Sequence, residues 1–259
     1  MHTPSIIFYR MLFSVAMLAV LILIRRESFR ISAKQLKAIF FLSIFYAATS
    51  LLLVESYLYI PSGLATTISF LYPIAVTLIL FFGFGQRVSA STLIAILLSF
   101  AGVFLLSFKS ASGNLDGRGL LCVIITIFTY SAYIVGMNKS CVNSLGSLVL
   151  SFYVLLFTTL FFSINMSLQG GLESIPGFME LGSLLLLGFI PTVLSNIFLF
   201  LALKRIDSAT TSLFGCMEPL TALLVGYFVF SEEMLWQQVL GAAIIIAAVL
   251  MVVLQTFKG

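Results

Sequence analysis

The chain has 259 residues, of which 61% are hydrophobic and only 8% are charged, whereas about 25% of the residues of a soluble domain are charged. A mean hydropathy of +1.20 cannot come from one anchor segment, so a soluble fold is excluded. The formal net charge of +4 is small, and the Lys and Arg residues lie in short connections without forming a continuous patch, which argues against nucleic-acid binding.

Apolar runs of about 20 residues, the length that crosses a bilayer, recur along the whole chain. They predict nine transmembrane helices, at 6–24, 36–54, 62–84, 88–107, 118–136, 146–166, 181–203, 209–230 and 235–256. The connections between them are short, so consecutive helices are expected to run antiparallel. The predicted fold class is all-α: a polytopic membrane helix bundle.

Charge is divided unequally between the two sets of alternate loops. Side B holds two cations, Lys109 and Arg118. Side A holds ten: Arg25, Arg26, Arg30, Lys34, Lys37, Arg87, Lys139, Lys204, Arg205 and Lys258. Because cytoplasmic loops carry the excess of Lys and Arg, side A and the C-terminus are expected in the cytoplasm. We therefore expect an integral, multi-pass protein of a bacterial inner (plasma) membrane.

The chain contains an internal repeat. Placing Pro73 over Pro219 aligns residues 57–107 without a gap to a stretch that begins at Leu203. Both copies have a small-residue entry, a proline inside a helix, a short polar turn and a final helix rich in small residues. The loop charges make 62–84 and 209–230 run in opposite directions, which predicts an inverted-topology repeat, a device of transporters that alternate access around a midplane site.

The sequence resembles the EamA-like family of the drug/metabolite transporter superfamily. The resemblance is carried by Phe8, Tyr9 and Arg10 (FYR), by 202–232 with a weaker copy at 58–85, and by 236–249. Members of this family have ten helices in two five-helix halves. The resemblance implies a first repeat of four helices at 1–107, which lacks the first family helix, a connecting loop at 108–117, and a second repeat of five helices at 118–259.

Glu218 is the clearest candidate for a functional residue, because a charge inside hydrocarbon costs several kcal/mol unless it is paired or hydrated. It precedes Pro219, which is expected to kink the helix and free backbone carbonyl groups. The repeat counterparts are Tyr72 and Pro73. The carboxylate could bind a cationic substrate group or carry a proton; a structural bond to a neighbouring helix is an equal alternative.

Other polar residues in the predicted helices form a weaker set of substrate-site candidates. Arg10 could hold a substrate carboxylate, although a snorkelling or structural Arg is favoured. The remaining candidates are Tyr46, Thr49, Ser50, Tyr72, Tyr130, Tyr133, Ser195 and Asn196. They suit an amphiphilic metabolite, but hydrogen bonding between helices is the favoured alternative for any single one.

Small residues recur in the last helix of each repeat. Ala95 and Ser99, and likewise Ala243 and Ala247, have the spacing that favours close helix packing.

Enzyme signatures are absent from the sequence. Its one histidine is His2, and it contains no HExxH, GxSxG or Walker loop and no metal-spaced cluster. We expect no enzyme activity, cofactor or metal. The predicted function is secondary transport or export of small metabolites, such as amino acids or similar amphiphiles, by alternating access, with proton coupling as one option. The alternative is a non-transporting membrane protein, either an assembly partner or a truncated inactive homologue.

Overall fold

The structure is a computed structural model that describes residues 3–86, 88–106, 116–168, 171–231 and 235–256. In this part of the chain every regular element is helical. The expected connecting loop at 108–117 lies largely outside the described residues.

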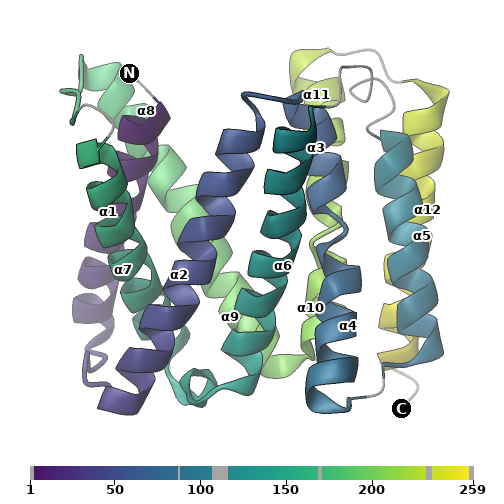
Figure 1. Cartoon of the computed structure of the whole chain (residues 1–259), viewed down its shortest axis with the longest axis horizontal. Helices are drawn as coiled ribbons and strands as arrows, with labels where there is room; N and C mark the ends of the chain where they lie inside the picture. Colours follow the sequence, from purple (N-terminus) through teal and green to yellow (C-terminus); the bar gives the residue numbers. More distant parts are fainter. Residues whose placement is uncertain (1–2, 87, 107–115, 169–170, 232–234, 257–259) are drawn as a thin grey trace. The chain divides into compact units, whose positions relative to one another are not determined.

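The helices follow the nine predicted spans (Figure 1). Five spans are single helices and one further span is short; the other three are divided. The elements are α1 (Thr3–Arg25), α2 (Ala33–Ser56), α3 (Ser62–Ser69), α4 (Tyr72–Phe84), α5 (Ala90–Leu106), α6 (Gly117–Lys139), the 3₁₀-helix η1 (Cys141–Ser144), α7 (Ser147–Leu168), α8 (Phe178–Gly188), the π-helix η2 (Phe189–Leu194), α9 (Ser195–Arg205), α10 (Ser208–Phe214), α11 (Met217–Phe230) and α12 (Trp236–Thr256).

Eight spans of the described chain are long and apolar enough to cross a membrane, and α5, with 17 residues, is the shorter ninth. The predicted polytopic membrane helix bundle is therefore confirmed. Two apolar helices joined by a short polar loop must cross in opposite directions, because the polar loop has to remain in water.

The chain divides into two compact units. Unit 1 comprises 1–47 and 136–205, and unit 2 comprises 48–135 and 206–259. Each unit therefore contains helices from both predicted repeats, and α2 and α6 contribute to both units. The boundaries of the predicted repeats remain a prediction.

In unit 1, α1 packs along α7, α8 and η2. Ser14 in α1 donates its hydroxyl to Arg10 O at 2.6 Å and to Gly188 O at 2.9 Å. A Cβ on Gly188 would lie only 3.2 Å from both Arg10 O and Ser14 Oγ. A small residue at 188 thus permits the close approach of α8 to α1, as small residues do in membrane helix pairs.

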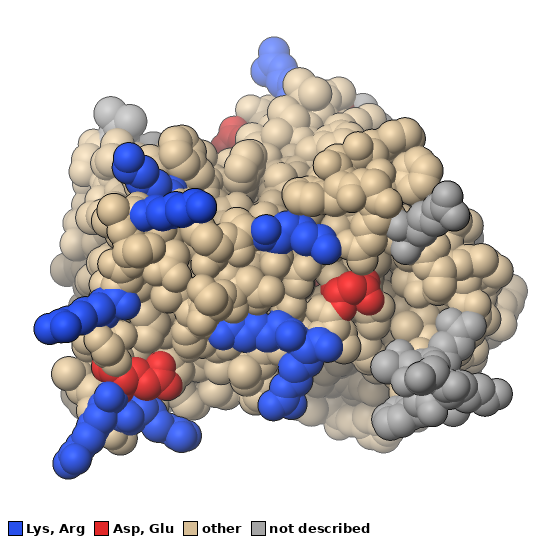
Figure 2. Space-filling model, turned by 90° about the horizontal axis from the view of Figure 1, so that it is seen from below, with Lys and Arg blue, Asp and Glu red and all other residues tan. Residues whose placement is uncertain are grey.

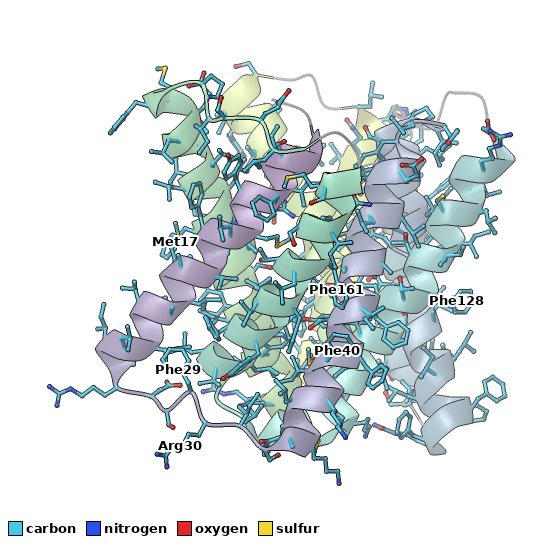
Figure 3. All side chains as sticks on the ribbon, turned by 60° about the vertical axis from the view of Figure 1, so that its left-hand side comes forward. Met17, Phe29, Arg30, Phe40, Phe128 and Phe161 are labelled. Atoms are coloured by element: carbon cyan, nitrogen blue, oxygen red, sulfur yellow. The ribbon has the colours of Figure 1, made fainter. Side chains whose placement is uncertain are left out.

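The loop that follows α1 is anchored to α7. The ring centroid of Phe29 lies 5.3 Å from that of Phe152, and Tyr153 Oη donates to Phe29 O at 2.8 Å. Figure 3 shows Phe29 at this loop and Arg30 pointing away from the helices. Deeper in unit 1, Phe40 of α2 packs at 5.5 Å against Phe161 of α7 (Figure 3).

In unit 2, α5 and α12 lie side by side (Figure 1). A Cβ on Gly102 would lie 2.8 Å from Gly241 O, and one on Gly241 would lie 2.5 Å from Gly102 O. Ala95 and Ser99 are buried, as their spacing predicts, but Ala243 and Ala247 are exposed. Close packing on the α12 side therefore uses Gly241 and not the predicted alanines.

The described cations of side A all belong to unit 1. They are Arg25, Arg26, Arg30, Lys34, Lys37, Lys139, Lys204 and Arg205, while Arg87 and Lys258 lie outside the described residues. Figure 2 shows several Lys and Arg side chains on the face seen from below Figure 1, some of them next to one another, with fewer Asp and Glu side chains among them. This end of unit 1 is therefore the positively charged one.

Candidate substrate site at paired helix breaks

Two spans of unit 2 are interrupted at corresponding positions. The span 62–84 breaks between α3 and α4, just before Tyr72 and Pro73, and the span 208–230 breaks between α10 and α11, just before Glu218 and Pro219. We call residues 70–73 and 215–219 the paired helix breaks. Proline is tolerated in the first turn of a helix because the N–H that it lacks has no partner there.

The geometry differs from the kinks expected at Pro73 and Pro219. Each proline begins a new helix after a break, instead of bending a continuous helix. Glu218 accordingly lies in the first turn of α11, although it is near the middle of the whole span. Discontinuous helices at mid-span are the elements from which many transporters build substrate sites.

Tyr72 connects the two breaks. Its hydroxyl donates to Ser212 O at 3.0 Å, and Ser131 Oγ of α6 donates to Tyr72 O at 3.0 Å. A Cβ on Gly215 would lie 1.7 Å from Tyr72 Oη, so only glycine leaves room for this side chain. Ser212 O also accepts the backbone N–H of Gly215 at 3.1 Å, so the carbonyl near the end of α10 receives two donors.

Three of the predicted tyrosines form a row beside the breaks. The ring centroids of Tyr72 and Tyr130 are 4.9 Å apart in an edge-to-face arrangement, and those of Tyr130 and Tyr133 are 6.2 Å apart and stacked. Tyr133 is fully buried, while Tyr130 is half-buried. The structure thus brings together candidates that are far apart in sequence, and Tyr130 is the member that leaves part of its ring accessible.

Glu218 is an exposed residue in the first turn of α11, at the second break. It interacts electrostatically with Tyr72. A negative side chain in the first turn of a helix is also favoured by the partial positive charge of the helix N-terminus. Such a carboxylate accepts hydrogen bonds, can neutralise a cation, and can accept a proton.

Thr49 and Ser50 of α2 have surroundings that differ from those of Glu218 and the three tyrosines. Thr49 Oγ1 and Thr129 Oγ1 are 2.8 Å apart, which links α2 to α6. Ser50 is half-buried. For Thr49 the structure therefore shows a hydrogen bond between helices, which is the alternative to a role in substrate binding.

The remaining candidates lie in unit 1. Arg10 is half-buried, and its Nε is buried without a hydrogen-bond partner among the described residues. Asn196 is buried; its Nδ2 donates to Thr192 O at 2.8 Å, while its Oδ1 has no partner in the described structure. Ser195 is exposed and Tyr46 is half-buried.

Several residues that shape these sites were not predicted from the sequence. Ser131 and Ser212 form hydrogen bonds with Tyr72, and Gly215 leaves room for its side chain. The glycine inside an apolar span was the one sequence feature that could have indicated this close contact. The π-helix η2, with Thr192 Oγ1 donating to Leu187 O at 3.0 Å five residues earlier, was also not predicted. Among the described residues, no group of three or more His, Cys, Asp or Glu could hold a metal ion.

A family model described as the EamA-like transporter family matches residues 1–108 and 117–254. The chain belongs to this family. Two proteins of Archaeoglobus fulgidus, each described as an uncharacterized transporter, are similar to this EamA-like chain. The first is 24% identical over 227 residues, covering 86% of this chain and 80% of the relative; the second is 27% identical over 172 residues, covering 64% and 58%.

The fold is shared with a solved structure. That crystal structure superposes with a TM-score of 0.84 at 15% sequence identity, and covers 99% of this chain and 90% of the other. Family, relatives and membrane-length helices together establish an EamA-like membrane transporter protein with multiple membrane spans.

Proposed function

We propose that this EamA-like protein is a secondary transporter that exports small amphiphilic metabolites bearing a cationic group, such as amino acids. The observation that carries the proposal is the pair of helix breaks, where Glu218 and the Tyr72–Ser212 hydrogen bond meet in one unit. Broken helices supply free backbone groups at mid-span, and these bind ions or polar substrates in many transporters.

The roles that we assign follow from side-chain chemistry. Glu218 accepts hydrogen bonds from an ammonium group, and the accessible part of the Tyr130 ring adds a cation–π contact. Tyr72 fixes the two breaks relative to each other within unit 2. Within unit 1, Arg10 has the chemistry to bind a carboxylate, and its Nε is buried without a hydrogen-bond partner in the described structure.

Transport of radiolabelled amino acids into proteoliposomes tests the proposal, with the native chain beside Glu218→Gln. We expect the variant to lose about tenfold or more of the uptake, because a hydrogen bond to a charged group contributes about 1.5–3 kcal/mol. Glu55→Gln is the matched control, since Glu55 is another exposed carboxylate in unit 2 but lies at the end of α2. An imposed pH gradient reports whether uptake is coupled to protons.

Normal transport by Glu218→Gln at every pH would remove this residue as substrate ligand and as proton carrier. If the folded native chain moves no amino acid or similar amphiphile across a broad panel, the non-transporting alternative replaces the proposal.

A further inference from the structure

A pocket of about 510 Å³ lies in unit 1, among α1, α7, η2 and α9. This volume is within the range of small-molecule sites. Most of its wall is apolar, and Leu194, Ile197 and Leu201 form one side of it on successive turns, facing Leu21 and Leu148. The pocket is separate from the paired helix breaks, all of whose residues belong to unit 2.

The pocket as a whole, from its apolar wall to its polar end, has the depth of one bilayer leaflet. From Leu194 to Lys204, both of which line the pocket, the chain rises about 15 Å at 1.5 Å per residue. The hydrocarbon core of a bilayer is about 30 Å thick. A ligand that follows this wall therefore extends from the helix ends to about the middle of the membrane, as an acyl chain does.

Three helix ends form the polar end of the pocket. Arg25 ends α1, Ser147 begins α7, and Lys204 is the penultimate residue of α9. Lys204 Nζ donates to Leu145 O, which holds the ammonium beside the start of α7. The first N–H groups of a helix have no intrahelical partner, so they and the helix dipole favour an anion there.

Ser147 supplies independent evidence for a ligand. Its side chain is only 9% exposed and lines the pocket, and its Oγ is buried without a hydrogen-bond partner in the described part of the chain. A buried hydroxyl without a partner is unfavourable by about 1–3 kcal/mol. The Oγ has almost no accessible surface, so a rotation about χ1 is needed before a phosphate oxygen in the polar end accepts its hydrogen bond.

Glu27 is the one acidic residue among those that line this pocket. It interacts electrostatically with Lys204, and its Oε2 lies 3.0 Å from the position that a Cβ on Gly146 would take. Two cations and one carboxylate leave the polar end with a net charge of about +1. This charge, above an apolar wall, is complementary to an amphiphile with a single negative charge at its head.

We propose that the pocket binds one anionic phospholipid of the phosphatidylglycerol type. The phosphodiester is held by Arg25, Lys204 and the start of α7, and one acyl chain lies along the wall formed by η2 and α9. Basic pockets between transmembrane helices favour anionic head groups, with about 1 kcal/mol for each Lys or Arg near the surface. The lipid then joins α1, α7 and α9 at the cation-bearing end of unit 1.

Quenching of a single tryptophan tests this site in the full chain. Trp236 is the only tryptophan, so Trp236→Phe with Phe189→Trp places the fluorophore in the pocket wall. The protein is reconstituted in bilayers that contain phosphatidylglycerol or phosphatidylcholine with brominated acyl chains. We expect phosphatidylglycerol to bind about fivefold or more tightly than phosphatidylcholine.

Paired variants separate this site from a general attraction to charge. The double variant Arg25→Gln with Lys204→Gln is expected to bind the two lipids with an affinity ratio close to one. Arg26→Gln with Arg205→Gln is the matched control, because it removes the same charge from adjacent exposed residues outside the pocket and should retain the preference. Ser147→Ala should weaken phosphatidylglycerol binding about two- to fivefold.

Four results would overturn the proposal. These are equal binding of the two lipids, equal loss of preference in both charge pairs, quenching by neither lipid, or binding of phosphatidylethanolamine as tight as that of phosphatidylglycerol. The last result would mean that Glu27 holds an ammonium group and that net charge does not select the lipid. Unchanged gel-filtration elution shows that each variant is folded.

Discussion

Gly215 shows how one small residue determines the geometry of the paired helix breaks. Its φ of −60° and ψ of −26° are ordinary helical values that any residue adopts. The constraint is therefore purely steric, since a Cβ would lie 1.7 Å from Tyr72 Oη and 3.0 Å from Tyr72 Cζ. The tyrosine hydroxyl occupies the space that a methyl group would need.

Gly215→Ala is therefore expected to destabilise the protein by about 1–3 kcal/mol, the range for overpacking. In a Tyr72→Phe background the same substitution should cost clearly less, because the closest contact is gone. Thermal unfolding in detergent measures both effects. Gly182→Ala is the control: a Cβ there meets nothing within 4 Å, so alanine should be neutral or stabilising through its helix propensity. Equal costs in both Tyr72 backgrounds would contradict the steric account.

Side-chain direction explains which candidate residues the sequence could predict. Consecutive residues of a helix point about 100° apart, and the structure exposes Ser195 and buries Asn196. The π-helix η2 just before them changes the helical phase. Polarity and depth are visible in a sequence, but this change of phase has no reliable signature there.

Helix pairs show a similar limit at the scale of elements. The positions of all nine spans follow from hydropathy, and their ends agree within a few residues. Hydropathy does not predict the contact face of α12. The spacing of Ala243 and Ala247 fits a helix interface as well as the position of Gly241 does, but both alanines are exposed. Gly241 decides the contact, since a missing Cβ lets two backbones approach most closely.

Gly102→Ala and Gly241→Ala should each destabilise unit 2 by about 1–3 kcal/mol, because each Cβ would lie within 3 Å of a backbone carbonyl that cannot rotate away. Gly83→Ala in α4 is the comparison, since its Cβ would be in ordinary contact with Ile79 at 4.0 Å. Unfolding in increasing concentrations of a denaturing detergent ranks the three variants by stability. Were Gly83→Ala as damaging as the other two, the close α5–α12 contact would not be the cause.

At the scale of the whole molecule, composition and loop charge predict most of what the fold shows. Hydrophobicity alone requires a membrane bundle, which the structure shows; charge and proline positions predict an inverted repeat, which stays a prediction. The division into two compact units was not predicted, because each unit joins helices from both ends of the chain. Such long-range pairing depends on side-chain packing between spans whose compositions are nearly identical.

The charge asymmetry predicts that side A of unit 1 faces the cytoplasm. The test uses a chain in which all three cysteines are replaced by alanine, with one new cysteine at exposed Ser28, in the loop after α1, or at exposed Ser174, in the loop after α7. An impermeant maleimide applied to intact cells should label Ser174→Cys and spare Ser28→Cys until the cells are lysed. The reverse pattern would invert the topology.

The hydrogen bond from Tyr72 to Ser212 also has a consequence for biosynthesis. Its two residues are 140 positions apart, so at about 5–20 residues per second a ribosome needs roughly 7–28 seconds to make the second after the first. During this interval the earlier broken span has entered the membrane without its acceptor. A nascent chain halted before Ser212 therefore has an incomplete first break, and the order of synthesis makes the C-terminal spans responsible for completing an N-terminal one.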